Sequence, residues 1–271
     1  MEMRDSNGWA NVDATGDSRR YIDYLDRATV HETAQAYKPR TYELVGAAAG
    51  RRLLDLGCGT GDDATAMARQ VGPGGEVVGV DLSKAMVEEA RRRAGGLGLP
   101  LRFEVADALA LPFADQSFDG CRADRVFQHL GDPEGALAEL VRVARPGAPV
   151  VVTDPDFGSA MLDVNDRALA RRVQAFVSEL VANPWSGRRL PGLFRVAGLT
   201  EIQLNLSFWP FDLDALNASF HLSEALPVMQ GRGLISAAEA EAFLAELAAR
   251  QAEGRFFGGV TFFVVAGRKA S

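Results

Sequence analysis

The stretch of sequence that decides the fold is Leu53-Leu54-Asp55-Leu56-Gly57-Cys58-Gly59-Thr60-Gly61. It begins in an apolar segment, 51–56, that is predicted to form a buried strand, and it leads into a segment with helical periodicity at 60–70. Glycines at this junction let the backbone turn tightly and approach a ligand closely. The start of the helix offers free N–H groups that favour a carboxylate or a phosphate. The segment therefore predicts a ligand-binding loop between a strand and a helix.

An acidic residue at the end of the next predicted strand narrows the class of ligand. Asp81 follows Gly57 by 24 residues and ends the apolar segment 76–81. A carboxylate at this position can accept hydrogen bonds from ribose hydroxyls. The glycine spacing differs from the dinucleotide fingerprint G-x-G-x-x-G, and no P-loop lysine follows. The sequence thus predicts a nucleoside-containing ligand and excludes the ATP or GTP cradle.

Strand and helix patterns alternate outward from this loop. Strands are predicted at 51–56, 76–81, 101–106, 118–123, 149–154, 200–208 and 260–267. Helices are predicted over 21–49 with a break or kink at Pro39, over 60–70, after Ser83, after Asp132-Pro133, around 169–181, over 189–197 and across 210–250. Such alternation is typical of βαβ units, which build a mostly parallel sheet covered by helices on both faces. Residues 1–20 show no periodicity, so a loose arm is expected there.

Composition limits the remaining possibilities. The chain has 271 residues, 47% of them hydrophobic and 24% charged, which is typical of a folded globular protein. A net charge of −7 disfavours nucleic acid or an anionic membrane as the main partner. The two cysteines, Cys58 and Cys121, provide no disulfide framework, and both are expected in the core. The polar N-terminus is no signal peptide and no apolar run is long enough to span a membrane, so a cytoplasmic location is expected.

The glycine loop and the motifs around it resemble those of class I S-adenosylmethionine-dependent methyltransferases of the small-molecule type, such as quinone-biosynthesis and antibiotic-tailoring enzymes. The matching segments are Asp55 to Gly61, Val77 to Asp81, Asp107-Ala108, Leu111-Pro112-Phe113, Ser117-Phe118-Asp119 and Arg145-Pro146-Gly147. The resemblance implies an α/β fold: a Rossmann-like, doubly wound, seven-stranded sheet whose last strand is antiparallel. It also implies an N-terminal helical arm or lid at 1–45, a methyltransferase domain at 46–271, and a helical cap inserted at about 209–255.

The resemblance implies a set of cofactor-binding residues for S-adenosylmethionine. The amino-acid end and ribose would be held by Asp55 and by the loop with Gly57, Cys58, Gly59 and Gly61. Asp81 would take the ribose hydroxyls with Leu82 beside the adenine, Asp107 and the Ala108 N–H would read the adenine edge, Met86 would pack on its face, and a carbonyl near Arg122 would hold the ammonium group. Taken singly, Asp55 can serve as a loop cap, Met86 as core and Asp107 as a turn former.

Methyl transfer from a sulfonium is an in-line displacement, so it needs alignment and exclusion of water more than a metal or a nucleophilic triad. The three histidines, His31, His129 and His221, are far apart, and no metal site is expected. An oxygen or carbon-acid acceptor would still need a base, for which His129 and Asp154 are candidates at the ends of the fourth and fifth strands. The alternative for His129 is a structural histidine bonded to backbone. Arg122, Asp124 and Arg125 form either an internal ion-pair network or a site that reads an anionic or carbonyl group.

The acceptor pocket is expected from aromatic residues outside the strands. Tyr21, Tyr24, Trp209 and Phe220, together with Arg125, are the candidate acceptor residues, although aromatic stripes also fill cores. The prediction is a methyltransferase, monomeric or homodimeric, that acts on O, N or C of a small, fairly apolar metabolite. Two alternatives remain: an enzyme of this fold that keeps the cofactor structurally while catalysing another reaction such as a cyclisation, and a non-catalytic cofactor sensor.

Overall fold

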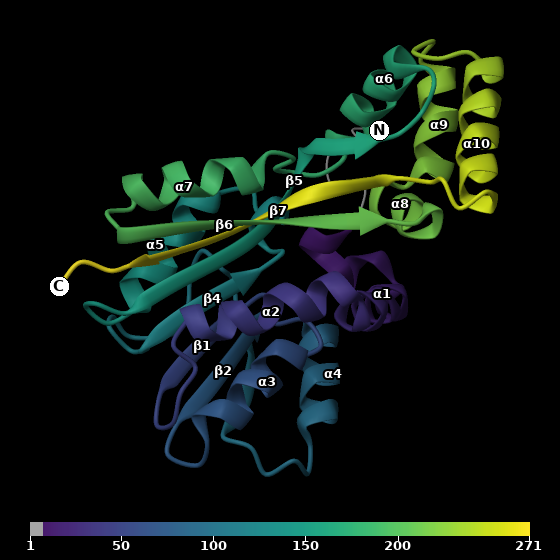
Figure 1. The fold of residues 1–271 in the computed structure, drawn as a ribbon. Helices are drawn as coiled ribbons and strands as arrows, with labels where there is room; N and C mark the ends of the chain where they lie inside the picture. The colour runs from purple at the N-terminus through teal and green to yellow at the C-terminus, as the bar shows by residue number, and fades with distance from the viewer. Residues whose placement is uncertain (1–7) are drawn as a thin grey trace.

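One twisted sheet of seven strands organises the computed structural model, which describes residues 8–271 (Figure 1). The strand order is β3-β2-β1-β4-β5-β7-β6, and β7 runs antiparallel to both of its neighbours while the other strands are parallel. The strands are β1 (Arg52–Leu56), β2 (Glu76–Asp81), β3 (Leu101–Val105), β4 (Gly120–Asp124), β5 (Pro149–Leu162), β6 (Thr200–Phe211) and β7 (Gly258–Arg268). The predicted fold class is confirmed.

Helices cover both faces of the sheet because neighbouring residues of each strand point to opposite sides. Leu53 and Val77 join one core with α2, α3 and α4, whereas Leu54 and Val78 join a second core with α5 and α7. The helices are η1 (Trp9–Thr15), α1 (Ser18–Val30), α2 (Glu32–Leu44), α3 (Asp62–Val71), α4 (Lys84–Ala94), η2 (Phe127–His129), α5 (Pro133–Val143), α6 (Arg167–Ser178), α7 (Ser186–Val196), α8 (Leu213–Phe220), α9 (Leu222–Gly231) and α10 (Ala237–Ala252).

Three strands, β5, β6 and β7, run farther than the sequence predicts, and β5 is extended the most. Strand β5 continues past the predicted end at Asp154 to Leu162 and stays paired with β7, with an irregularity between Asp156 and Met161. Its pairing with β4 stops at Thr153, so Pro155 lies where β5 has become an edge, and an edge position tolerates a proline. Figure 1 shows β5, β6 and β7 projecting beyond the other strands toward a group of helices, α6 and α8–α10. The cap therefore includes α6 as well as the predicted segment.

The N-terminal segment is more ordered than the loose arm that the sequence predicts. Residues 1–7 of that arm lie outside the described residues, but η1 begins at Trp9 and α1 at Ser18. The carboxylate of Asp13 accepts hydrogen bonds from the Ser83 hydroxyl (2.6 Å) and from the N–H groups of Lys84 (2.8 Å) and Ala85 (3.2 Å), so η1 is attached to the start of α4. None of the helices that the structure describes is long and apolar enough to cross a membrane.

Candidate active site

A cavity of about 890 Å³ opens at the carboxyl ends of β1, β2 and β4, between the N-terminal helices and the cap. Ligands of open parallel sheets bind at this position, where the strand order reverses between β1 and β4. Two of the lining residues join α1 to the cap: Arg20 Nη2 lies 3.4 Å from His221 Nδ1 at the junction of α8 and α9. The volume lies near the upper end of the range of about 300–1,000 Å³ typical of ligand sites, so two small reactants can share it.

The glycine loop forms one wall of the cavity. Gly57 and Gly59 have left-handed backbones, with φ of 68° and 50°. A Cβ atom on Gly57 would lie 2.3 Å from Val126 Cγ2, and one on Gly59 would lie 2.9 Å from Leu25 Cδ1. Both positions therefore need glycine for conformation and for space. Gly61 also has a left-handed backbone, with φ of 84°, but it does not line the cavity, and a Cβ there would lie 2.6 Å from the ring of Phe103.

Asp81 lines the cavity at the end of β2 with acceptor capacity to spare. Its two carboxylate oxygens accept the N–H groups of Gly59 (2.9 Å) and Ser83 (3.0 Å), and burial raises its pKa. A carboxylate offers about four acceptor positions, so about two remain for ribose hydroxyls. Beside it, the Leu82 side chain is 56% exposed at the cavity, as expected for an apolar surface that a planar ring would cover.

The adenine end of the predicted site has a matching pair of polar groups. Asp107 and Ala108 both line the cavity, and Asp107 Oδ1 accepts the Leu109 N–H at 2.9 Å. The Ala108 N–H makes no hydrogen bond within residues 8–271. Met86 and Cys58 line the same region and are both buried. These residues fit S-adenosylmethionine, because they provide a ribose acceptor, a free backbone donor and an apolar bed at the predicted places.

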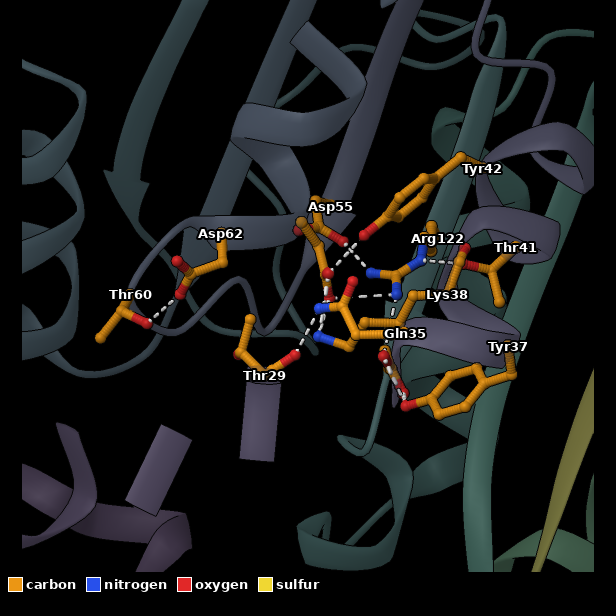
Figure 2. A network of polar contacts seen from close by, with 12 residues as sticks. Thr29, Gln35, Tyr37, Lys38, Thr41, Tyr42, Asp55, Thr60, Asp62 and Arg122 are labelled. Carbon is orange, nitrogen blue, oxygen red and sulfur yellow. Dashed lines mark hydrogen bonds and ion pairs between the residues drawn. The ribbon is translucent and has the colours of Figure 1, made fainter. Parts of the chain in front are cut away.

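Asp55 and Arg122 do not line the cavity, although both are among the predicted cofactor-binding residues. They are partners across the β1–β4 pair, and Arg122 Nη1 donates to Asp55 Oδ1 at 2.9 Å (Figure 2). Arg122 is only 1% exposed, and it also binds Asp63 (3.1 Å) and Asp124 (2.8 Å). Their side chains therefore support the glycine loop from beneath and do not reach the ligand space.

The buried ion network extends to α2 and fixes that helix to the sheet. Lys38 binds Asp63 at 2.9 Å, Tyr42 donates to Asp63 at 2.6 Å, and the Tyr37 hydroxyl donates to both oxygens of Asp124 at 3.0 Å. Although burial raises the pKa of Asp63, Arg122 and Lys38 together hold it well below its usual range. Burial dominates at Asp55, whose pKa rises to about 6 despite Arg122.

Arg125, three residues after Arg122, has a different environment. Its side chain lines the cavity and lies over the ring of Trp209, with its Cζ atom 6.0 Å from the ring centre. Across the described residues its guanidinium makes no ion pair or hydrogen bond, and its Nε atom is buried without a partner. Of the three charged residues at the end of β4, Arg122 and Asp124 lie within the strand and belong to the internal network, whereas Arg125 follows the strand and lines the cavity.

The two candidate bases are placed differently. His129 lines the cavity, where burial and the nearby Arg125 lower its pKa to about 3, so the ring is neutral and weakly basic near neutral pH. Asp154 is fully buried outside the cavity lining, accepts a hydrogen bond from the Ser186 hydroxyl, and has its pKa raised to about 8 by burial. Its position gives it no contact with a ligand. No group of side chains suited to a metal ion occurs in the part of the chain that the structure describes.

Some of the predicted acceptor residues form the wall of the cavity, and one supports that wall from behind. Tyr21, Tyr24 and Trp209 line the cavity. Phe220 does not: it is 3% exposed and packs edge-to-face behind Phe157 and Phe211, which themselves line the wall. The many aromatic residues in the sequence predicted where the acceptor side lies. They did not show which side chains form the cavity wall and which lie behind it.

Several residues that shape the cavity were missed by the sequence analysis. Trp9 stacks on His129 with ring centres 5.9 Å apart, and Leu25 covers Gly59. Lys38 and Asp63 join α2 to α3 through the buried network. The clearest unused signal was Lys38. This lysine lies on the buried face of α2, and a buried lysine requires a carboxylate partner.

Comparisons with known proteins agree with this geometry. A model of the methyltransferase domain family matches residues 47–195. A demethylmenaquinone methyltransferase of Thermus thermophilus is 38% identical over 168 residues, which cover 62% of this chain and 76% of the relative. The O-methyltransferase resE of Aspergillus sclerotiorum is 33% identical over 200 residues, covering 69% and 72% of the two chains.

Solved structures agree on the fold. The YcgJ protein of Bacillus superimposes with a TM-score of 0.61 at 21% identity, over 88% of this chain and 99% of that one. The matched family model, the relatives and the cavity that fits the cofactor lead to the same assignment. The chain belongs to the class I S-adenosylmethionine-dependent methyltransferases.

Proposed function

We propose that this methyltransferase acts on O, N or C of a small, mostly apolar acceptor bound between the N-terminal helices and the cap. The observation that carries the proposal is one continuous cavity, which runs from Gly57 and Asp81 to the aromatic wall around Trp209 and Phe211. A cofactor at the glycine loop and an acceptor at that wall would share a single enclosed space. In-line displacement requires this juxtaposition.

S-adenosylmethionine supplies an electrophilic methyl group on a sulfonium. For its binding we propose Gly57, Cys58, Gly59, Asp81, Leu82, Met86, Asp107 and Ala108, all of which line the cavity. We assign Asp55, Gly61 and Arg122 a positioning role, since they shape the loop from outside the cavity. The buried network has three carboxylates and two cations, and its excess negative charge favours a cationic ligand nearby.

The acceptor side is proposed to act as a lid that keeps water out. It combines the part of the predicted N-terminal arm that the structure describes, residues 8–45, with the cap at about 209–255, to which α6 is added. The contact between Arg20 and His221 supports closure of the two against each other. We assign Tyr21, Tyr24, Arg125 and Trp209 to acceptor binding, and His129 to a neutral polar contact in preference to a base of ordinary strength. Phe220 stabilises the wall from behind.

The names of two relatives support a small acceptor such as a quinone precursor or a hydroxyl compound, because one is called a demethylmenaquinone methyltransferase and the other an O-methyltransferase. The partner that we propose is accordingly a small molecule and neither nucleic acid nor a membrane surface. We propose that the enzyme itself is a monomer or homodimer in the cytoplasm. Cyclisation with a retained cofactor would consume no methyl groups, so product formation separates it from this proposal.

The test is to incubate the protein with S-adenosylmethionine and, separately, with small phenols and quinols, with peptides, and with transfer RNA. Mass spectrometry then quantifies S-adenosylhomocysteine. We expect it to form only with small molecules. Release with peptides or RNA alone would contradict the proposed acceptor class, and conversion of an acceptor without S-adenosylhomocysteine would favour the cyclisation alternative.

A further inference from the structure

The strongest unexplained feature of the cavity is a cation without a counter-ion. Within residues 8–271, the Arg125 side chain makes no ion pair or hydrogen bond; it contacts the Trp209 ring, and Asp124 and Asp63 act on it only at longer range. Asp124 cannot serve as the counter-ion, since its carboxylate is already bound by Arg122 (2.8 Å) and by the Tyr37 hydroxyl (3.0 Å). A largely buried charge without a partner is costly, so such a group is normally compensated by a ligand or lost.

The backbone holds Arg125 in this position under strain. Its φ is 61°, in the left-handed region that an arginine rarely adopts. Its N–H donates to the Thr153 carbonyl at 2.7 Å, and its own carbonyl accepts from Gln128 Nε2 at 3.2 Å. Strained residues that are fixed from both sides concentrate at binding and catalytic sites. The strand end thus presents this particular side chain to the cavity.

The surroundings of Arg125 limit what can pair with it. The charged and titratable groups that face it are Tyr24 on α1, Tyr37 on α2, Asp63 on α3, Asp124 on β4 and His129 on η2. The aromatic partner Trp209 is itself stacked on His31 (4.8 Å between ring centres) and on Phe262 (4.9 Å). A planar apolar body beside a fixed cation is therefore the environment offered to the acceptor.

We propose that Arg125 binds the acceptor as an oxyanion, and that the acceptor is an aromatic or enolic compound with an acidic hydroxyl group. On binding, the hydroxyl proton leaves to water and the oxygen accepts charge-assisted hydrogen bonds from the guanidinium. This inference rests on the proposed function and specifies its acceptor. It also explains why the cavity needs no base of ordinary strength: His129 has a pKa near 3, and Asp154 lies outside the lining.

Binding of 4-nitrophenol and of two-ring nitrohydroxyarenes to protein saturated with S-adenosylhomocysteine tests the inference without turnover. Absorption distinguishes the hydroxyl from the oxyanion, and the methyl ethers of the same compounds are the uncharged controls. We expect the bound pKa of the best probe to fall by about one unit, which corresponds to a tenfold preference for the oxyanion.

Arg125→Met is expected to weaken oxyanion binding about 10- to 100-fold and to abolish the pKa shift, while methyl-ether binding stays unchanged. Arg125→Lys should restore part of the shift, because the charge returns without the planar donor pair. Arg171→Met is the matched control, since Arg171 is exposed on α6 outside the cavity and its loss should change nothing.

The inference is overturned if no oxyanion in the panel binds more tightly than its methyl ether, or if Arg125→Met keeps the shift. The measurement on the unmodified protein decides the matter even where a variant fails to fold. Methylation of neutral amines with no oxyanion preference would contradict this inference and leave the proposed function standing. Failure to bind S-adenosylhomocysteine would contradict both.

Discussion

The cofactor side and the acceptor side of the cavity each have an arginine, and the surroundings of the two arginines are opposite. On the cofactor side, Arg122 is paired with Asp55, Asp63 and Asp124 beneath the glycine loop. On the acceptor side, Arg125 lies three residues later at the end of the same strand and has no counter-ion in the described chain. The first environment is complete without a ligand, while the second is not.

The paired Arg122 positions the glycine loop, whereas the unpaired Arg125 is available to recognise a ligand. The closed network fixes α2, α3 and two strands relative to one another, so the glycine loop keeps its shape before the cofactor arrives. The open side keeps a desolvated cation on a strained backbone, and an anionic ligand would give that cation a partner. The cofactor is common to the family, so a preorganised cofactor side is expected. The acceptor differs between members, so an acceptor side that is completed only by its own ligand is also expected.

The largest effect is expected from removing each arginine in turn. Arg122→Met leaves three buried carboxylates without their shared cation and should lower the free energy of unfolding by about 3–5 kcal/mol. Arg125→Met removes an unpaired charge, so stability should change by less than about 1 kcal/mol or increase. Urea unfolding of both variants measures the contrast. Equal losses would show that Arg125 has a structural counter-ion after all.

The next largest effect concerns the cofactor. Asp81→Ala removes the proposed ribose acceptor and should weaken S-adenosylhomocysteine binding by about 2–4 kcal/mol, measured by calorimetry. Because Asp81 also accepts the Gly59 and Ser83 N–H groups, Asp81→Asn serves as a companion that keeps the side-chain shape. Unchanged affinity in both variants, with the thermal melt intact, would remove Asp81 from the cofactor site.

The cofactor side was also the more predictable from sequence. Gly57, Gly59 and Asp81 have roles that follow from local turn chemistry and from strand ends, and the structure brings all three to the cavity. The pairing of the Asp55 and Arg122 side chains could not be predicted, because it depends on the register between β1 and β4, which no local pattern encodes.

The acceptor side depends on contacts between distant segments. Helix η1 has no periodicity of its own and is held by Asp13 at the start of α4, so the sequence suggested a loose arm. Phe220 and Trp209 look equivalent as aromatic residues before β7, yet one supports the wall and the other forms it. Burial of this kind is decided by packing and not by spacing.

A smaller effect is expected at the aromatic wall. Trp209→Leu removes the ring beside Arg125 and should raise the acceptor KM about 5- to 30-fold, equivalent to about 1–2 kcal/mol, with cofactor affinity within twofold. Phe208→Leu on the same strand is the matched control, because Phe208 stacks on Phe257 outside the cavity. Steady-state kinetics beside thermal melts separate the effects. A parallel rise in KM for both variants would point to general loosening of β6.

The smallest effect concerns Asp154, the candidate base that lies behind the acceptor side. Burial raises its pKa from about 3.8 to about 8, so between these values the folded state holds a proton that the unfolded state has released. Stability contributed by this group is therefore lost as pH rises from about 4 to 8. Asp154→Asn cannot ionise and should reduce the fall in unfolding free energy between pH 5 and pH 9 by at least about 1 kcal/mol. Methyl transfer should survive, because Asp154 does not line the cavity. A variant with an unchanged pH profile of stability but with turnover lowered a hundredfold would reverse this assignment and make Asp154 the base.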